Sequence, residues 1–410
     1  MKKPELLAPA GDFEKLKFAF AYGADAVYAG LPMFSLRTRE NRFDLESVKK
    51  GIEYAHSIGR KIYITANIYA HNIKIEPFLE AMDHVVPLGA DAFIMSDPGL
   101  IDLVREKHPQ VPIHLSTQAN NTNWAQLRFW KKLGVSRVIL ARELMIPEIR
   151  EIVEKNPDVE TEAFVHGAMC MSYSGRCLLS DYMTGQPSNS GSCTQSCRWN
   201  YKLHVEERER PNEFIPIEED EHGSYMFNSK DLCAIELLPS IIATGINSLK
   251  IEGRNKNFLY LATVTRAYRQ AIDAHFEGTF EKVLPTLLDE LRSIDFRGYT
   301  RGFFEGPLNN KINYDRTALA TREFGGKVLS ILPEGWVELD IKNKISVGDT
   351  IEWLTPDRGI LTQTVTQIRN QENFGIQSVS AGCLWNPTIL TEHPIDKYCL
   401  LRTVIRAKKT

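Results

Sequence analysis

The sequence has no long hydrophobic run. Its 410 residues contain no stretch of about 18 or more consecutive apolar residues, and the opening Met-Lys-Lys-Pro-Glu is not followed by an apolar segment of signal-peptide length. These are the patterns that transmembrane helices and secretory signals require. We therefore expect a cytoplasmic protein with no membrane partner.

A strong net charge is also absent. The chain carries 49 Lys and Arg against 52 Asp and Glu, which gives a formal net charge of -3. This balance creates no global positive field that would indicate a nucleic-acid partner. Basic residues gather locally at 37–42, 128–132 and 406–409, but each group is also explained as a solvated face.

Several catalytic and nucleotide-binding motifs are missing. No GxGxxG or GxxxxGK sequence follows an apolar run of strand length, which argues against a dinucleotide or ATP site. No His-Glu-x-x-His motif is present, and no Ser/His/Asp order stands out. The sequence therefore does not support a conventional hydrolase.

Short apolar runs alternate with segments of helical spacing through the first part of the chain. The helical segments, such as 45–56, 75–88 and 124–133, often follow Ser, Thr, Asn or Asp and end near glycine. This alternation with eight strands predicts a TIM-like (β/α)8 barrel, with a doubly wound open sheet as the alternative. The predicted strands are 5–11, 24–30, 61–67, 91–96, 112–117, 136–141, 159–166 and 246–252.

The alternation is interrupted between strands seven and eight. About 80 residues separate them, and loops of this length are usually functional. We place a cysteine-bearing insertion there, at about 167–240. After a helix at 257–276, short alternating strands and turns predict a small antiparallel β-barrel. The predicted domains are a barrel at 1–290, a linker at 291–324 and the small β-barrel at 325–410.

Five of the seven cysteines lie in or beside this insertion. A chain of this length does not need clustered thiols for stability, so they indicate a metal or iron–sulfur centre. The spacing matches no compact zinc or ferredoxin motif, and four of these thiolates could hold either zinc or an Fe–S cluster. Some could instead be buried thiols, which is how we interpret Cys383 and Cys399. The five are Cys170, Cys177, Cys193, Cys197 and Cys233.

Polar residues at the carboxyl ends of the predicted strands are the candidate catalytic groups, because the sites of parallel α/β barrels lie there. Cys170 follows His166 by four residues, so we expect the cysteine centre and the barrel mouth to form one site. His166 could be a general acid or base, a neighbour of the cluster, or a structural histidine. The other candidates are Asn67, Arg142, Glu252 and Arg254.

Two roles are open for the arginines. Arg142 and Arg254 could bind a carboxylate or phosphate in bidentate fashion, or they could pair with Glu143 and Glu252. Lys250 lies on the same face of strand eight as Glu252, where an ion pair inside the barrel is the simplest interpretation.

Several segments together carry a resemblance to a known family. The pattern His-Gly-x-x-Cys-x6-Cys-Leu-Leu-Ser at 166–180 continues to Cys-Thr-Gln-Ser-Cys-Arg-Trp at 193–199. With Glu-Leu-Leu-Ala-Pro-Ala-Gly-Asp at 5–12, the stretch 28–37 and Ser-Leu-Lys-Ile-Glu-Gly-Arg at 248–254, the chain resembles peptidase family U-32, the collagenase-like proteins, over essentially its whole length. The layout is closest to the tRNA hydroxylation group of that family.

The resemblance implies an oxygen-independent hydroxylase with a 4Fe-4S cluster. It implies tRNA as partner, prephenate (a small dicarboxylate) as co-substrate and oxygen source, and 5-hydroxyuridine at the wobble position as product. A related chain of the family is a further possible subunit. A collagenase-like peptidase and a non-catalytic RNA-binding subunit stay open as other functions. The implied cluster ligands are Cys170, Cys177, Cys193 and Cys233, with Cys197 as a substitute for Cys193.

Overall fold

The computed structural model describes residues 2–36, 42–170, 172–199, 204–206, 214–216, 230–306 and 320–405. The chain divides into two compact units. The first comprises Met1–Leu16, Ala24–Asn255 and Arg297–Ala318, and the second comprises Lys17–Gly23, Lys256–Phe296 and Leu319–Thr410. Within the described ranges, no helix is long and apolar enough to cross a membrane.

The first unit contains a closed barrel of eight parallel strands. The last of them, β11, pairs in parallel with both β1 and β7, and this pairing closes the sheet. The predicted TIM-like barrel and its eight strands are confirmed, and the open-sheet alternative is wrong. The strands are β1 (Glu5–Pro9), β2 (Ala26–Gly30), β3 (Lys61–Thr65), β4 (Ala92–Met95), β5 (Ile113–Leu115), β6 (Arg137–Ile139), β7 (Glu160–Ala168) and β11 (Ser248–Ile251).

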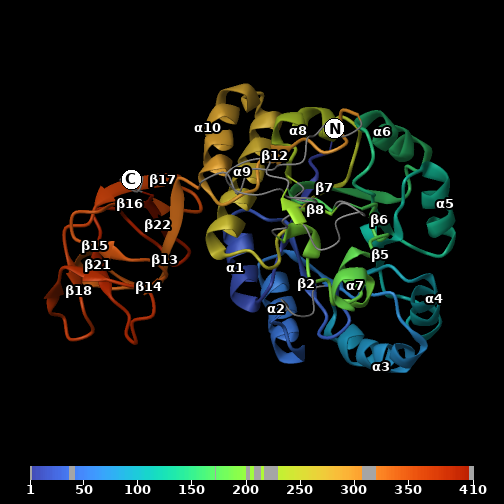
Figure 1. Cartoon of the computed structure of the whole chain (residues 1–410), viewed down its shortest axis with the longest axis horizontal. Coiled ribbons are helices and arrows are strands. Elements are labelled where there is room, and N and C mark those ends of the chain that lie inside the picture. Colours follow the sequence, from blue (N-terminus) through green and yellow to red (C-terminus); the bar gives the residue numbers. More distant parts are fainter. Residues whose placement is uncertain are drawn as a thin grey trace. The chain divides into compact units, whose positions relative to one another are not determined.

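Helices follow most of the strands and lie around the barrel, as α3 to α6 show in Figure 1. Asp44, Asp97 and Asn123 each accept hydrogen bonds from backbone amides of the first helical turn, so the expected polar caps begin these helices. The α-helices up to the eighth strand are α1 (Phe13–Ala21), α2 (Leu45–Ser57), α3 (Ile75–Val85), α4 (Pro98–Lys107), α5 (Trp124–Lys132), α6 (Ile146–Lys155), α7 (Leu179–Thr184) and α8 (Leu238–Ile242). Single 3-10 turns are η2 (Asn72–Lys74), η3 (Val86–Leu88), η4 (Thr117–Ala119), η5 (Ser188–Ser190), η6 (Ser196–Arg198) and η7 (Ile235–Leu237).

The insertion lies between the seventh and eighth barrel strands, as predicted. It begins where β7 ends, and it returns through β10 (Asp231–Cys233), which runs antiparallel to the last part of β7. The register places Cys233 opposite His166. β12 (Tyr299–Thr300) adds to β10 in parallel, and β8 (His204–Glu206) pairs with β9 (Phe214–Pro216).

The second unit combines two helices with a curled antiparallel sheet. The helices are α9 (Phe258–Glu277) and α10 (Phe280–Ser293). The sheet order is β17-β16-β22-β13-β14-β21-β18-β19, and β15 pairs with β20. The bounds are β13 (Arg322–Ile331), β14 (Trp336–Ile341), β15 (Ile345–Ser346), β16 (Thr350–Leu354), β17 (Ile360–Thr364), β18 (Ile368–Arg369), β19 (Gly375–Ile376), β20 (Ser378–Val379), β21 (Thr388–Leu390) and β22 (Leu400–Val404), with the 3-10 turn η8 (Pro333–Gly335).

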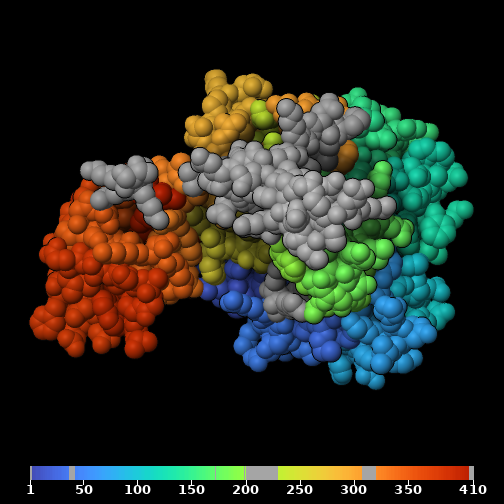
Figure 2. Space-filling view, in the orientation of Figure 1, coloured from blue at the N-terminus to red at the C-terminus, as the bar shows by residue number. Residues whose placement is uncertain are grey.

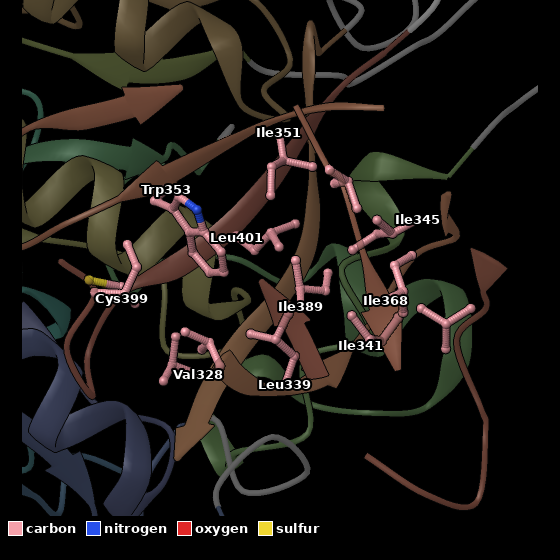
Figure 3. Packing of buried hydrophobic residues seen from close by; sticks show 14 residues of the cluster. Val328, Leu339, Ile341, Ile345, Ile351, Trp353, Ile368, Ile389, Cys399 and Leu401 are labelled. Carbon is pink, nitrogen blue, oxygen red and sulfur yellow. The ribbon is translucent and has the colours of Figure 1, made fainter. Parts of the chain in front are cut away.

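A single apolar core fills this curled sheet. Trp353, Leu339 and Ile389 are fully buried in it, and Figure 3 shows them packed with aliphatic side chains from the facing strands. The Trp353 indole N–H donates to Gln363 Oε1 at 3.0 Å, so its one polar atom is satisfied inside the core. The predicted small antiparallel β fold is confirmed.

Candidate active site at the barrel mouth

Asn67 makes hydrogen bonds that link the ends of several barrel strands. It lies two residues beyond β3 and is buried. Its Nδ2 donates to Ser116 Oγ beyond β5 at 3.2 Å, and its Oδ1 accepts from the Leu36 amide at 3.2 Å. The Ser96 hydroxyl, directly after β4, donates to the Asn67 carbonyl at 3.1 Å. Because both ends of the amide are engaged, Asn67 organises the mouth of the barrel.

Arg254 lies three residues beyond β11, the strand that closes the barrel. Its Nη1 donates to Thr65 Oγ1 at 2.9 Å, and the guanidinium stands 5.9 Å from the centre of the Tyr28 ring. Glu252 is half-buried, and its backbone amide donates to the His166 carbonyl at 2.9 Å. The β11 end therefore connects β2, β3 and β7 at the mouth.

Arg142 follows β6 and reaches across to β7. Its Nη1 donates to the Ala168 carbonyl at 2.8 Å, and its guanidinium lies 4.0 Å from the centre of the Phe164 ring. Its Nε is buried and has no hydrogen-bond partner among the described groups. A buried donor in this position can be satisfied by an acceptor on a bound ligand.

Glu143, which was one of the two alternatives for a partner of Arg142, binds the insertion instead. Its carboxylate accepts from the Ser174 backbone amide at 2.9 Å and from the Ser174 hydroxyl at 3.2 Å. Ser174 lies between Cys170 and Cys177, so the end of β6 holds the turn that carries the first two thiols.

A second set of contacts fixes the same turn on the barrel rim. Gly175 has a φ of +73°, and a Cβ there would collide with the carbonyl oxygen of Gln118, so only glycine fits. Asn189 Nδ2 donates to the Gly175 carbonyl at 3.0 Å, and the Tyr69 amide donates to the Asn189 carbonyl at 3.1 Å. The Tyr69 hydroxyl donates to the Gln118 carbonyl at 3.0 Å.

Sequence reasoning missed these anchoring residues. Ser174, Gly175, Tyr69 and Asn189 carry no recognisable motif, and their partners lie 14 to 120 residues away in the chain. The one available signal was Gly175, within the sequence Tyr-Ser-Gly-Arg at 173–176. A lone glycine indicates a special backbone position but does not reveal what packs against it.

His166 is almost fully buried, near the end of β7. Its ring makes an edge contact with Tyr299 of β12, with ring centres 5.4 Å apart. The strand registers place it opposite Cys233 on one side and Ile251 on the other. His166 is therefore positioned beside the returning end of the insertion.

The five cysteines of the insertion differ in exposure. Cys170 is exposed, Cys177, Cys193 and Cys197 are half-buried, and Cys233 is buried on β10. The Ser188 hydroxyl donates to the Cys177 carbonyl at 2.7 Å, which secures the backbone beside that thiol. Among the described residues, no group of three or more His, Cys, Asp or Glu side chains forms a metal-binding arrangement. Thiolates are the ordinary ligands of Fe–S centres, but within the described part of the chain the structure does not bring three of these thiols together.

The opposite end of the barrel is closed by paired charges. Arg137, the first residue of β6, binds Glu5 at 2.6 Å, Glu160 at 2.7 Å and Glu162 at 3.2 Å. Burial alone would raise the pKa of Glu5, but the Arg137 guanidinium and the Tyr63 hydroxyl outweigh it and lower the pKa below its ordinary value. Glu5, Arg137 and Glu160 are the first residues of their strands. Residues at this end of a TIM barrel usually contribute to stability and not to catalysis.

Lys250 belongs to this buried layer. Its ammonium lies 2.9 Å from Glu162, whereas the sequence pattern paired it with Glu252. Burial lowers the pKa of Lys250, and the Glu162 carboxylate opposes this change. The sequence interpretation was wrong about the partner because the β7–β11 pairing brings together residues 88 positions apart.

Two family models match this chain. The model described as peptidase family U32 matches residues 11–313, and the model described as peptidase family U32 C-terminal domain matches residues 320–402. The chain belongs to peptidase family U32. In this U32 protein the first matched region spans the barrel from α1 onward, the insertion, α9 and α10, and the second spans the curled sheet.

Curated relatives align with nearly all of this U32 protein. tRNA hydroxylation protein P of Escherichia coli (strain K12) is 42% identical over 410 residues, which cover 90% of each chain. tRNA hydroxylation protein P1 of Bacillus subtilis (strain 168) is 40% identical over 412 residues, which cover 100% of this chain and 96% of that protein. A protein named collagenase, from Porphyromonas gingivalis (strain ATCC BAA-308 / W83), is 32% identical over 381 residues, which cover 89% of this chain and 90% of that one.

Proposed function

We propose that this U32 protein is an RNA-modifying enzyme that hydroxylates uridine in tRNA. The observation that carries the proposal is its identity of 40% and 42% with two tRNA hydroxylation proteins, over almost their whole length. The reaction we propose converts the wobble uridine to 5-hydroxyuridine, with prephenate as the oxygen source. A thiol-bearing insertion fixed on an open barrel mouth supports a redox reaction on a substrate that enters from that face.

The proposed cofactor is a 4Fe-4S cluster. Cys170, Cys177, Cys193 and Cys233 would hold it, with Cys197 as a substitute for Cys193. When bound, such a cluster supplies electron transfer and Lewis-acid chemistry. Support comes from the number and kind of donors, since thiolates are the ordinary ligands of these clusters.

The residues of the mouth have separate proposed roles. Arg142 binds a carboxylate of the small dicarboxylate co-substrate, because its buried Nε is a donor without a described partner. Arg254 is already held by Thr65, so we assign it to shaping the mouth and supplying positive charge. His166 and Glu252 are the titratable groups at the ends of β7 and β11, and they are the candidates for moving a proton.

The test is mass spectrometry of wobble nucleosides from a strain that lacks the gene. We expect the unchanged chain to restore 5-hydroxyuridine and Cys170→Ala to fail. Cys383→Ala, which removes a thiol of the second unit, is the matched control and should restore the nucleoside fully. After anaerobic purification, the unchanged chain should contain iron and sulfide, and Cys170→Ala should contain much less.

Two results would contradict the proposal. A colourless protein without iron or sulfide after anaerobic purification would exclude the cluster. Unaltered 5-hydroxyuridine in the deletion strain would exclude the reaction, and tRNA binding by that same protein would then indicate a non-catalytic RNA-binding subunit. Cleavage of gelatin that disappears in Cys170→Ala would establish the collagenase-like alternative, to which the relative named collagenase points.

A further inference from the structure

Large apolar side chains are exposed in the segment that carries the thiols. Tyr182 is 87% exposed, Leu178 is 76% exposed, Tyr173 is 64% exposed and Trp199 is 45% exposed. They lie within 27 consecutive residues of a unit in which most of the other described aromatic side chains are buried or half-buried. Exposed apolar groups that gather in this way usually mark a binding surface.

These side chains belong to neighbouring turns of one anchored segment. The Tyr182 amide donates to the Leu178 carbonyl at 2.9 Å, so the two residues lie one turn apart on α7. The Trp199 amide donates to Ser196 at the start of η6, and η6 packs against α7. The surface of this segment, in light green, forms part of the face seen in Figure 2. We call Tyr173, Tyr182 and Trp199, with the adjacent Leu178, the aromatic surface.

A positive charge lies beside the aromatic surface at the barrel mouth. Arg176 is exposed, and its amide donates to the Tyr173 carbonyl at 2.9 Å, so both side chains project from one turn. The guanidinium also lies near Tyr69 on the rim, where it opposes the rise in the Tyr69 pKa that burial causes. The next residue, Cys177, is one of the thiols assigned to the cofactor.

Exposed aromatic rings with an adjacent arginine match the chemistry of unpaired nucleic-acid bases. Single-stranded RNA is recognised by stacking its bases on aromatic side chains and on guanidinium planes, whereas a duplex hides the faces of its bases. The chain has a net charge of -3, so general attraction to phosphate contributes little, and stacking has to supply more of the affinity.

We propose that Tyr173, Tyr182 and Trp199, with Arg176, form a stacking surface for the unpaired bases that flank the target nucleotide of the RNA substrate. This inference rests on the proposed function, and it names the surface through which a single-stranded loop is held against the barrel mouth. The target base would then reach the mouth beside the turn that Glu143 and Gly175 fix.

The test measures the binding of two fluorescent RNAs to the full chain by anisotropy. One is a tRNA anticodon stem-loop with uridine at the wobble position, and the other is a fully paired duplex of the same length. We expect Tyr182→Ala and Trp199→Ala each to weaken stem-loop binding by roughly 5- to 150-fold, the range for loss of one stacked base. Binding of the duplex should not change, and Tyr182→Phe, which keeps the ring, should bind the stem-loop like the unchanged chain.

Phe129→Ala is the matched control, because Phe129 is 54% exposed on α5, on the outside of the barrel. It removes an exposed ring of similar size and should leave both RNAs bound as before. Circular dichroism melting should be unaltered in all variants, since each side chain is exposed.

Three results would overturn the inference. The first is unchanged stem-loop affinity in both alanine variants, and the second is an equal loss for stem-loop and duplex. The third is unaltered RNA binding together with a change from dimer to monomer in light scattering, which would assign the surface to a second copy of the chain. Nucleoside analysis separates failure of this inference from failure of the proposed function. If loss of the gene leaves 5-hydroxyuridine unchanged while the chain binds the stem-loop through these rings, the reaction is refuted and the stacking surface is not.

Discussion

Removing Glu162 should destabilise the barrel strongly. Its carboxylate is fully buried and accepts from Lys250 at 2.9 Å and from Arg137 at 3.2 Å. In Glu162→Ala, Arg137 keeps Glu5 and Glu160, but Lys250 loses the carboxylate that opposes the effect of burial on its pKa. Loss of one partner of a buried ion pair costs about 3–5 kcal/mol. We expect a loss of that size in the free energy of unfolding.

Native-state hydrogen exchange at the amides of β7 and β11 is the suitable assay, because it reports on the barrel without requiring the two units to unfold together. Glu160→Ala is the matched control: it removes another carboxylate bound to Arg137, but one whose side chain is 47% exposed, so we expect a loss of only about 0–1 kcal/mol. The double variant Glu162→Leu with Lys250→Met should recover most of the stability. A loss below about 1 kcal/mol in Glu162→Ala would refute this account of the layer.

Three further predictions concern the rim, the barrel and the curled sheet. Gly175→Ala should displace the cysteine turn from Gln118, which faster proteolysis at 172–178 would reveal. Because the Arg137 guanidinium holds the pKa of Glu5 below its ordinary value, the ion pair stabilises the fold above the ordinary carboxyl pKa and is lost as the pH falls through the lowered one. The pH dependence of acid unfolding should therefore be shallower in Glu5→Gln. Burial raises the pKa of the Cys399 thiol to about 12, so iodoacetamide at pH 8 should modify it, by mass spectrometry, only after unfolding.

The barrel was predictable because its signals are local. Each strand is a short apolar run, and caps such as Asp97 and Asn123 lie next to the helices that they begin. Closure was not local, since it depends on β11 pairing with both β1 and β7. Eight strands favoured the closed form over the open sheet, but the decision required the three-dimensional pairing.

The candidate site was predictable in position and not in its contacts. The rule that sites lie at strand carboxyl ends identified Asn67, Arg142 and Arg254, which all stand at the mouth. Their partners were not predictable, because the sequence left anion binding and pairing with Glu143 or Glu252 open for the two arginines. Glu143 binds Ser174, 31 residues away, and Arg254 binds Thr65, 189 residues away. Side-chain partners across a barrel depend on strand register, which a single sequence does not contain.

The two ends of the barrel differ in how their buried arginines are paired, and this difference supports placing the proposed reaction at the mouth. At the amino ends of the strands, Arg137 is matched by carboxylates, so that end offers little to a ligand without breaking ion pairs. At the mouth, Arg142 Nε is buried without a hydrogen-bond partner among the described residues. Buried polar atoms left in this way cost stability, and a bound substrate that supplied their partners would recover that cost as binding energy. The proposed polar co-substrate would therefore gain binding energy by accepting from Arg142 at the mouth.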